Sequence, residues 1–446
     1  MNNRIAFKKS TFFYFLLVLS TIAYYWLAYQ TSREQFLTVL ALFILLFGTY
    51  FICYKVFSKT HFTSLLLAGV LFRMLLLFST PNLSDDVYRF IWDGRLAANG
   101  INPFSYLPGE ILQMPPVKGI TTELFMKLNS PNYYTVYPPV LQGIFWVTAK
   151  LFPLNIFSAI VFLKILIVTV EIGNFFLLMR IIKKLSLPKH QCLLYILNPL
   201  VIIELTGNVH FEGVMIFFVL LAWLLILSNN WQRSAISLGL GIATKLIPVL
   251  FIPLLINKLG WKRGLFFGLF SGLTVLILFA ILFDINTIQH LLSSVNLFFR
   301  NFEFNAGLYY VVRWIGIKLT GYNIIEYAGP ALSLAAIIII FFLSLRNKKN
   351  TPDLFLHYSL FVISIWFLFS TTVHPWYICL PVALSVFGPF RYAVLWSFTV
   401  TLSYSAYSFH PVRENLWLVG AGYILVAIYA LWEFKFNKKP EYSLSE

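Results

Sequence analysis

The sequence predicts an all-α fold, that of a polytopic helical membrane protein with about 12 membrane-spanning helices. Hydrophobic residues make up 59% and charged residues 11% of the 446 positions, against about 45–50% and about 25% in soluble domains. Apolar stretches close to the roughly 20 residues that cross a bilayer recur along the chain. We expect a single domain, residues 1–446. The expected spans are 11–30, 36–54, 62–80, 156–180, 190–207, 211–228, 262–283, 325–345, 354–373, 375–390, 393–409 and 415–434.

Basic residues gather in the short segments between the expected spans and predict the orientation of the chain. The net charge is +16, and cytoplasmic loops carry such an excess of Lys and Arg. We therefore expect a multi-pass plasma (inner) membrane protein with both termini in the cytoplasm. This distribution favours membrane lipids over nucleic acid as a partner. The clusters are Arg4/Lys8/Lys9, Lys55/Lys59, Arg180/Lys183/Lys184/Lys189, Lys258/Lys262/Arg263, Arg346/Lys348/Lys349 and Lys435/Lys438/Lys439.

Three segments interrupt the regular series of spans. Residues 81–136 form a long, aromatic-rich loop that this orientation places outside, where we expect interfacial helices and the catalytic residues. Residues 137–152 are short enough for an interfacial or re-entrant helix, with a full crossing as the alternative. Residues 232–256 contain two glycines, a proline and Lys245, and predict a broken helix that lines a cavity.

Acidic residues are concentrated where the chain first leaves the apolar segments. Asp85, Asp86 and Asp93 are three of only 17 acidic residues. Helix capping accounts for one acid, but two adjacent acids repel each other and point about 100° apart on a helix. We interpret Asp85 and Asp86 as catalytic, one of them accepting a proton from an attacking hydroxyl. Arg89 is four residues from Asp85 and from Asp93, which fits either a salt-bridge ladder or a phosphate contact.

The other candidate substrate contacts lie in the broken helix and at outward turns. Lys245 is an isolated cation in an apolar segment, and we expect it to bind a phosphate rather than to snorkel to the interface. At the turns, a His beside aromatic residues fits either a cavity rim or a membrane anchor. No ligand spacing supports a metal held by the aspartates and a His, so no metal or other certain cofactor is predicted. The turn residues interpreted as substrate contacts are His210, Glu212, His374 and Tyr377. Arg300 and Asn305 lie in a further outward run of Arg and aromatic residues, which fits either a clasp for a sugar and a phosphate or an interfacial helix with a solvated polar face.

These landmarks resemble the GT-C glycosyltransferases that use polyprenyl-phosphate sugars, specifically the bacterial polyprenol-phosphomannose-dependent mannosyltransferases. The resemblance implies a GT-C fold with an outward-facing active site on the first large loop and Asp85 or Asp86 as catalytic base. The family often has Asp where Glu212 stands and Tyr where Phe90 and Phe104 stand. The resemblance rests on SDDVYRFIWDGR at 84–95, GINPF at 100–104, Tyr137-Pro138-Pro139, Asn198-Pro199, His210-Phe211-Glu212, Lys245 with Pro248, Phe304-Asn305 and His374-Pro375-Trp376-Tyr377.

The expected function is that of a membrane glycosyltransferase. By the resemblance, it transfers a hexose, expected to be mannose, from a polyprenyl-phosphate sugar to a glycan, lipid or protein acceptor on the extracytoplasmic face. A lipid-linked glycan flippase or ligase, and a secondary transporter with a broken helix, are the alternatives. Transporter carboxylates usually lie near mid-membrane, whereas Asp85 and Asp86 border a long loop. The sequence therefore favours the transferase.

Overall fold

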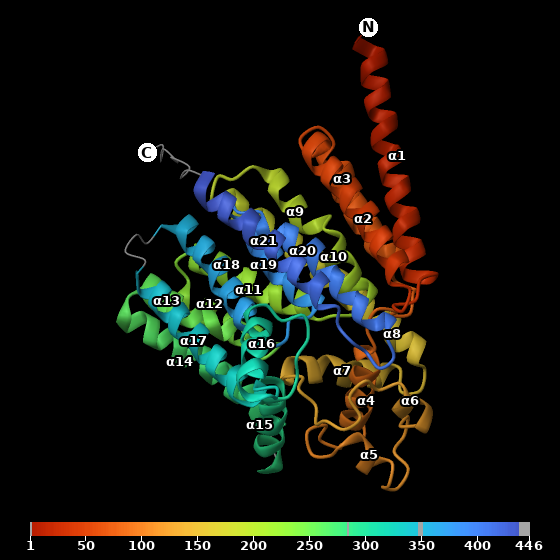
Figure 1. Ribbon diagram of the computed structural model, residues 1–446, viewed down its shortest axis with the longest axis vertical. Helices are drawn as coiled ribbons and strands as arrows, with labels where there is room; N and C mark the ends of the chain where they lie inside the picture. The colour runs from red at the N-terminus through yellow and green to blue at the C-terminus, as the bar shows by residue number, and fades with distance from the viewer. Residues whose placement is uncertain (1, 283–284, 347–350, 437–446) are drawn as a thin grey trace.

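The computed structural model describes residues 2–282, 285–346 and 351–436, and in these ranges the regular elements are all helices (Figure 1). The start of α1 (Asn2–Tyr29) and the end of α21 (Leu416–Phe436) lie at the upper end in Figure 1. The segment α4 to α7 lies at the opposite, lower end. Four basic residues of the predicted inner clusters, Lys348, Lys349, Lys438 and Lys439, are outside the described ranges.

Long apolar helices confirm a polytopic helical membrane architecture, but not the count of about twelve spans. Six helices of the described residues are long and apolar enough to cross a membrane, or seven if one bent pair counts as a span. The other expected spans are shorter helices or broken ones. The six long spans are Lys9–Tyr29 in α1, Phe36–Phe57 in α2 (Phe36–Ile52) and η1 (Cys53–Phe57), α8 (Ile156–Lys184), α14 (Trp261–Ala280), α17 (Ile325–Arg346) and α21.

Three of the expected spans are divided into short pieces, most of them buried inside the bundle. Residues 190–207 become η2 (Lys189–Cys192), α9 (Leu193–Ile196), α10 (Pro199–Val201) and η3 (Ile202–Gly207), and the last two lie at 116° to α11 (Glu212–Ile226). Pro199 cannot continue a helix, and Asn198 caps the next one by accepting from Leu200 N at 3.0 Å. Residues 375–409 form η5 (Pro375–Ile378), α19 (Cys379–Ser385), α20 (Tyr392–Thr399) and η6 (Val400–Ser408).

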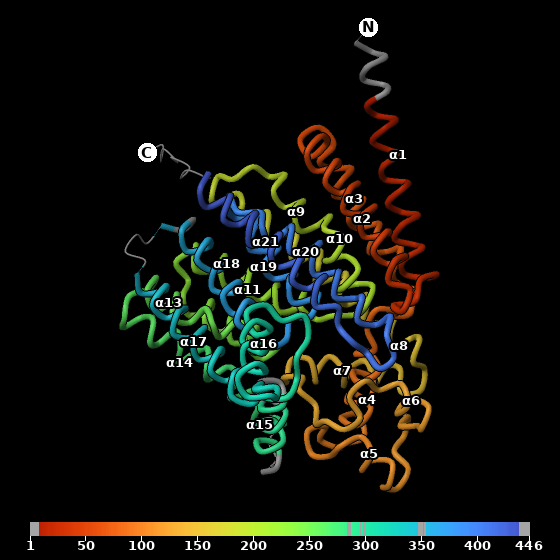
Figure 2. Tube along the Cα trace, in the orientation of Figure 1, coloured from red at the N-terminus to blue at the C-terminus, as the bar shows by residue number. Residues whose placement is uncertain are grey.

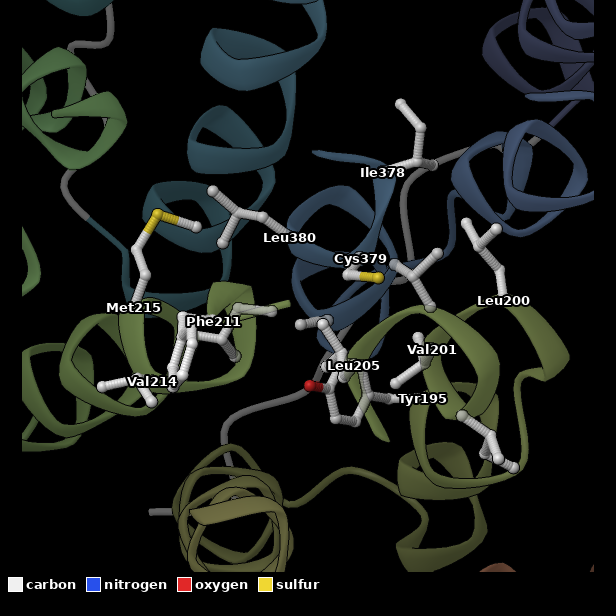
Figure 3. Close-up of a cluster of buried hydrophobic side chains, with 14 of the residues drawn as sticks. Tyr195, Leu200, Val201, Leu205, Phe211, Val214, Met215, Ile378, Cys379 and Leu380 are labelled. Carbon is white, nitrogen blue, oxygen red and sulfur yellow. The ribbon is translucent and has the colours of Figure 1, made fainter. Parts of the chain in front are cut away.

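These short pieces share one apolar core. Figure 3 shows Val201 and Leu205 in one cluster of buried side chains with Cys379, Leu380 and Met215 of α11. All five side chains are buried. Short helices are stable here because neighbouring protein, not lipid, surrounds their ends.

The predicted broken helix consists of α12 (Trp231–Ile242), η4 (Ile247–Phe251) and α13 (Ile252–Leu259). The α-helix ends before Lys245, whose backbone N–H still donates to Gly241 O at 3.0 Å. Pro248 lies at the start of η4, where a missing N–H costs least. Lys245 therefore lies on a turn between two helices rather than on a helix face.

The lower end contains the long loop and its short helices, α4 (Asp86–Ala98), α5 (Pro108–Ile111), α6 (Thr122–Met126) and α7 (Pro139–Leu151). With 13 residues, α7 is too short to cross a bilayer alone. It packs tightly on α4, because a Cβ at Gly94 would overlap the Phe145 carbonyl group. Helix α4 is therefore held closely against α7 at Gly94.

Helix α15 (Ile285–Arg300) lies beside this end (Figure 2). Its His290 ring stacks on Tyr134 at 3.7 Å, and His290 Nδ1 lies 2.7 Å from Phe104 O. These contacts tie α15 to the loop. The remaining helices, α3 (Phe62–Leu75), α16 (Leu308–Thr320) and α18 (Pro352–Phe369), complete the bundle.

A buried ion pair joins α3 to α8 inside the bundle. Arg73 Nη2 lies 2.9 Å from Glu171 Oε2, and both side chains are almost fully buried. The guanidinium also donates to Ile196 O at 2.8 Å, while Glu171 Oε1 accepts from Asn174 and Tyr195. The pair is therefore enclosed in a network of hydrogen bonds.

Breaking this pair should destabilise the protein. In Glu171→Gln, the Arg73 charge stays buried without an anion, and we expect a loss of roughly 3–5 kcal/mol. Thermal unfolding in detergent measures the effect as a lower midpoint. Glu123→Gln removes an exposed ion pair with Lys127 and serves as the control, where a change of about 0–1 kcal/mol is expected. Equal midpoints for the two variants would contradict the analysis.

Candidate active site

The adjacent aspartates lie at the start of α4. Asp86 is its first residue, and Asp85, which precedes it, makes no capping hydrogen bond through its side chain. Instead, the Ser84 hydroxyl accepts from Asp86 N at 3.3 Å. Both carboxylates are therefore available for other partners.

The two carboxylates turn to different partners. Asp85 Oδ2 lies 2.6 Å from Arg33 Nη1, in the turn between α1 and α2. Asp86 Oδ1 accepts from Asn129 Nδ2 at 2.6 Å, and Asp86 Oδ2 lies 3.9 Å from His210 Nδ1. Burial raises the pKa of Asp86 above its ordinary value, although the Asn129 amide and the Lys245 ammonium oppose this rise. Asp86 is therefore the carboxylate whose proton affinity is increased.

His210 lies between Asp86 and a second, deeper carboxylate. Its Nε2 is 3.4 Å from Glu204 Oε2, and Glu204 is fully buried. The other oxygen of Glu204 accepts from Asn208 and Tyr404. Sequence reasoning missed Glu204 because it lies in the expected span 190–207. The feature of the sequence that could have identified Glu204 is that it is a lone acid in an apolar segment, where acids are rare unless they have a function.

Lys245 and Glu212 form an ion pair between the helix break and the first residue of α11. The Glu212 side chain is fully buried, whereas that of Lys245 is 19% exposed. The Lys245 ammonium also lies over the Tyr377 ring, 5.1 Å from its centroid. The pair directs the ammonium into a partly open site, and its charge acts on Asp86.

Three stacked rings form one wall of the site. The Trp376 ring lies 3.7 Å from the His210 ring and 4.4 Å from the His374 ring, measured between centroids. Burial, followed by the repulsion of Lys245, lowers the pKa of His374 to about 3. His374 is therefore neutral and offers hydrogen bonds rather than a positive charge.

Five of the predicted site residues lie together in the structure: Asp86, His210, Glu212, Lys245 and Tyr377. His374 joins them through Trp376, whose ring it contacts. Asp85 adjoins this group through the backbone, but its carboxylate faces Arg33.

Arg89, Arg300 and Asn305 have partners of their own. The buried Arg89 donates to Asp93 at 2.8 Å and to the Ser130 and Tyr133 carbonyls, as in the salt-bridge alternative. Arg300 lies 3.7 Å from Glu326. Asn305 donates through its backbone to Glu414 and through its side chain to Val373 O, beside His374. Their substrate contacts stay predictions.

The described residues hold no group of three or more His, Cys, Asp or Glu side chains placed to bind a metal ion. The chemistry present is a carboxylate with raised proton affinity, an ammonium whose charge acts on it, and aromatic rings. These groups can accept a proton, hold an anion and pack against an organic ligand.

Comparison with known families identifies the class of this helical membrane protein. Residues 16–259 match the family described as alpha-(1->6)-mannopyranosyltransferase, N-terminal domain. This is more than half of the chain and includes both aspartates, His210, Glu212 and Lys245. The chain belongs to this family, and the protein is a mannosyltransferase. No curated protein matches it.

The ion pair between Lys245 and Glu212 predicts that replacing Glu212 lowers the rate of mannosyl transfer. In Glu212→Gln the ammonium loses its anionic anchor, and misplacement of a catalytic group by about 1 Å costs about 100-fold in rate. We expect a loss of that order in mannosyl transfer by isolated membranes. Glu212→Asp keeps the charge and should retain more activity. Equal rates for Glu212→Gln and the unchanged protein, at equal amounts in the membrane, would refute the role of the pair.

Proposed function

We propose that the protein transfers mannose from a polyprenyl-phosphate mannose to a hydroxyl group of a glycan, lipid or protein acceptor. The reaction takes place on the extracytoplasmic face of the plasma membrane, in a GT-C fold. The observation that carries the proposal is the series of contacts that links Asp86 to Lys245: Asp86 lies against His210, His210 stacks on Trp376, and the Lys245 ammonium lies over the neighbouring Tyr377 ring. Helix α4, which begins at Asp86, lies at the end of the protein opposite the start of α1 and the end of α21 (Figure 1). The excess of basic residues between helices supports termini in the cytoplasm.

The transfer is a single displacement. The acceptor oxygen attacks the anomeric carbon of mannose, the bond from that carbon to the phosphate oxygen breaks, and the polyprenyl phosphate leaves with the electron pair. The acceptor proton passes to a carboxylate. An ammonium near the phosphate stabilises the charge that develops on it.

Asp86 is the base in this proposal. Asp85 already forms an ion pair with Arg33, whereas Asp86 is bound by a neutral amide. A carboxylate with a raised pKa takes up a proton more readily, provided that it remains ionised at the working pH. His210 faces Asp86 and is oriented by Glu204 and by the Trp376 ring.

Lys245 is the group that holds the phosphate. Glu212 takes part of its hydrogen-bonding capacity, and an ammonium has three donors, so others remain for a ligand. Because His374 is neutral, it can add a hydrogen bond to the phosphate but no charge. The flippase, ligase and transporter alternatives lose support, because the family is one of mannosyltransferases.

Removing the proposed base tests the assignment. Asp86→Asn keeps the shape of the side chain but cannot accept the proton, so we expect mannosyl transfer to fall about 10²–10⁴-fold. Asp85→Asn should retain more activity. The assay uses purified protein with polyprenyl-phosphate mannose as donor, and a nucleotide mannose as the control donor. Full activity of Asp86→Asn, or transfer only from the nucleotide, would overturn the proposal.

The pH dependence of the reaction tests the same residue independently. The base must be ionised, so the rate falls as the pH drops through the pKa of Asp86. Since burial raises this pKa, the acidic limb of kcat/KM should lie above the ordinary carboxyl value of about 4.

Replacing Asn129, whose amide binds Asp86, should shift the acidic limb of the pH profile in a known direction. Asn129→Ala removes the hydrogen bond that lowers the pKa of Asp86, so the limb should shift to higher pH. Glu123→Gln, on the exposed side of α6, is the control and should not move it. An unchanged limb in Asn129→Ala would show that another group controls the pH dependence.

A further inference from the structure

A polar hollow adjoins the active site at Asp85. It has a volume of about 610 Å³ and lies between the α1–α2 turn and the segment that leads from α3 to α4. Asp85 lines this hollow, while the next residue, Asp86, faces His210. The hollow is therefore one residue away from the proposed base.

Hydrogen bonds hold the walls of the hollow in place. The Asn82 amide donates to Leu27 O and to Thr31 O, both at 2.6 Å, and so ties the two walls together. The Tyr29 hydroxyl donates to Leu75 O at 2.8 Å. Ser408 Oγ, from the end of η6, donates to Glu34 O at 3.1 Å. A hollow with such fixed walls requires little ordering when a ligand binds.

The charged groups in the hollow are paired but remain accessible. The Arg33 side chain is 28% exposed and that of Asp85 33% exposed, although they form an ion pair. A guanidinium has five N–H donors and a carboxylate about four acceptor positions, so each can bind a ligand while the pair persists. Arg33 is further held over the Tyr407 ring, at 5.1 Å.

The remaining lining matches a carbohydrate better than an anion. Gln30, Ser32 and Thr80 add amide and hydroxyl groups, and Tyr29 and Phe78 add aromatic surface. Sugars present hydroxyls around the ring and apolar C–H groups on its faces, and these need mixed donors and acceptors beside apolar walls. A second carboxylate, Glu34, would repel a phosphate.

We propose that this hollow binds the sugar of the acceptor. Arg33 and Asp85 form hydrogen bonds with the hydroxyl groups of the sugar, and one further hydroxyl is presented to Asp86. The inference rests on the proposed function and assigns separate tasks to the adjacent acids. Asp85 binds the acceptor, and Asp86 removes its proton. Lys245, on the side of Asp86, is left for the donor phosphate.

Steady-state kinetics with octyl α-mannoside as acceptor test the proposal. Arg33→Met removes the guanidinium, and Ser32→Trp fills the hollow without changing the aspartates. Each should raise the KM for octyl α-mannoside at least about tenfold, Arg33→Met because one charge-assisted hydrogen bond is lost, and Ser32→Trp because the indole ring occupies the space of the sugar. The KM for polyprenyl-phosphate mannose should change less than about twofold. Lys127→Met, which breaks an exposed ion pair on α6, is the matched control and should leave both values unchanged.

A binding measurement separates this inference from the proposed function. Isothermal titration of octyl α-mannoside into the protein needs no donor, and the affinity should fall in Arg33→Met and Ser32→Trp but not in Lys127→Met. Unchanged binding and unchanged acceptor KM would overturn the hollow as an acceptor site, as would a rise in the donor KM instead. If the protein transfers no mannose from polyprenyl phosphate but these binding losses appear, the proposed function fails and the acceptor site stands.

Discussion

The ion pair between Lys245 and Glu212 is the interaction on which the site depends. It joins the break after α12 to the first turn of α11, which follows the bend after η3. A single buried charge would be too costly here, so each residue requires the other. In this pair the Lys245 side chain stays partly exposed, and its charge opposes the rise in the pKa of Asp86.

Around this pair, the site separates positive from negative charge. His374 is held neutral, and His210 stacks against the same Trp376 ring between two carboxylates. Lys245 therefore supplies positive charge on one side, and Asp86 supplies negative charge on the other. This polarity suits a reaction in which a proton leaves the nucleophile while charge grows on a departing phosphate.

Much of the site could be predicted because isolated charges are informative in an apolar chain. Asp86, His210, Glu212 and Lys245 all stand out from their neighbours, and the structure brings them together. Partners contributed by distant segments could not be predicted. The sequence gives no sign that Arg33 binds Asp85 or that Glu204 faces His210, because both contacts depend on how turns pack.

The fold was predicted less completely for a related reason. Hydropathy identifies apolar segments, but it does not distinguish a helix that faces lipid from a short one enclosed by protein. Pro199 and Pro375 were the available signals for the broken segments. Arg89 shows the same limit, since its spacing fits both a ligand and an ion pair, and its contacts with Asp93 and two carbonyls are seen only in three dimensions.

The broken segments also bear on how the protein is assembled. Pieces such as α10 and η3 leave backbone groups that lipid cannot satisfy, and they carry the buried acid Glu204. They cannot enter the bilayer one by one, as long helices such as α8 can. We therefore expect these pieces to become buried only once long helices such as α8 are in place around them.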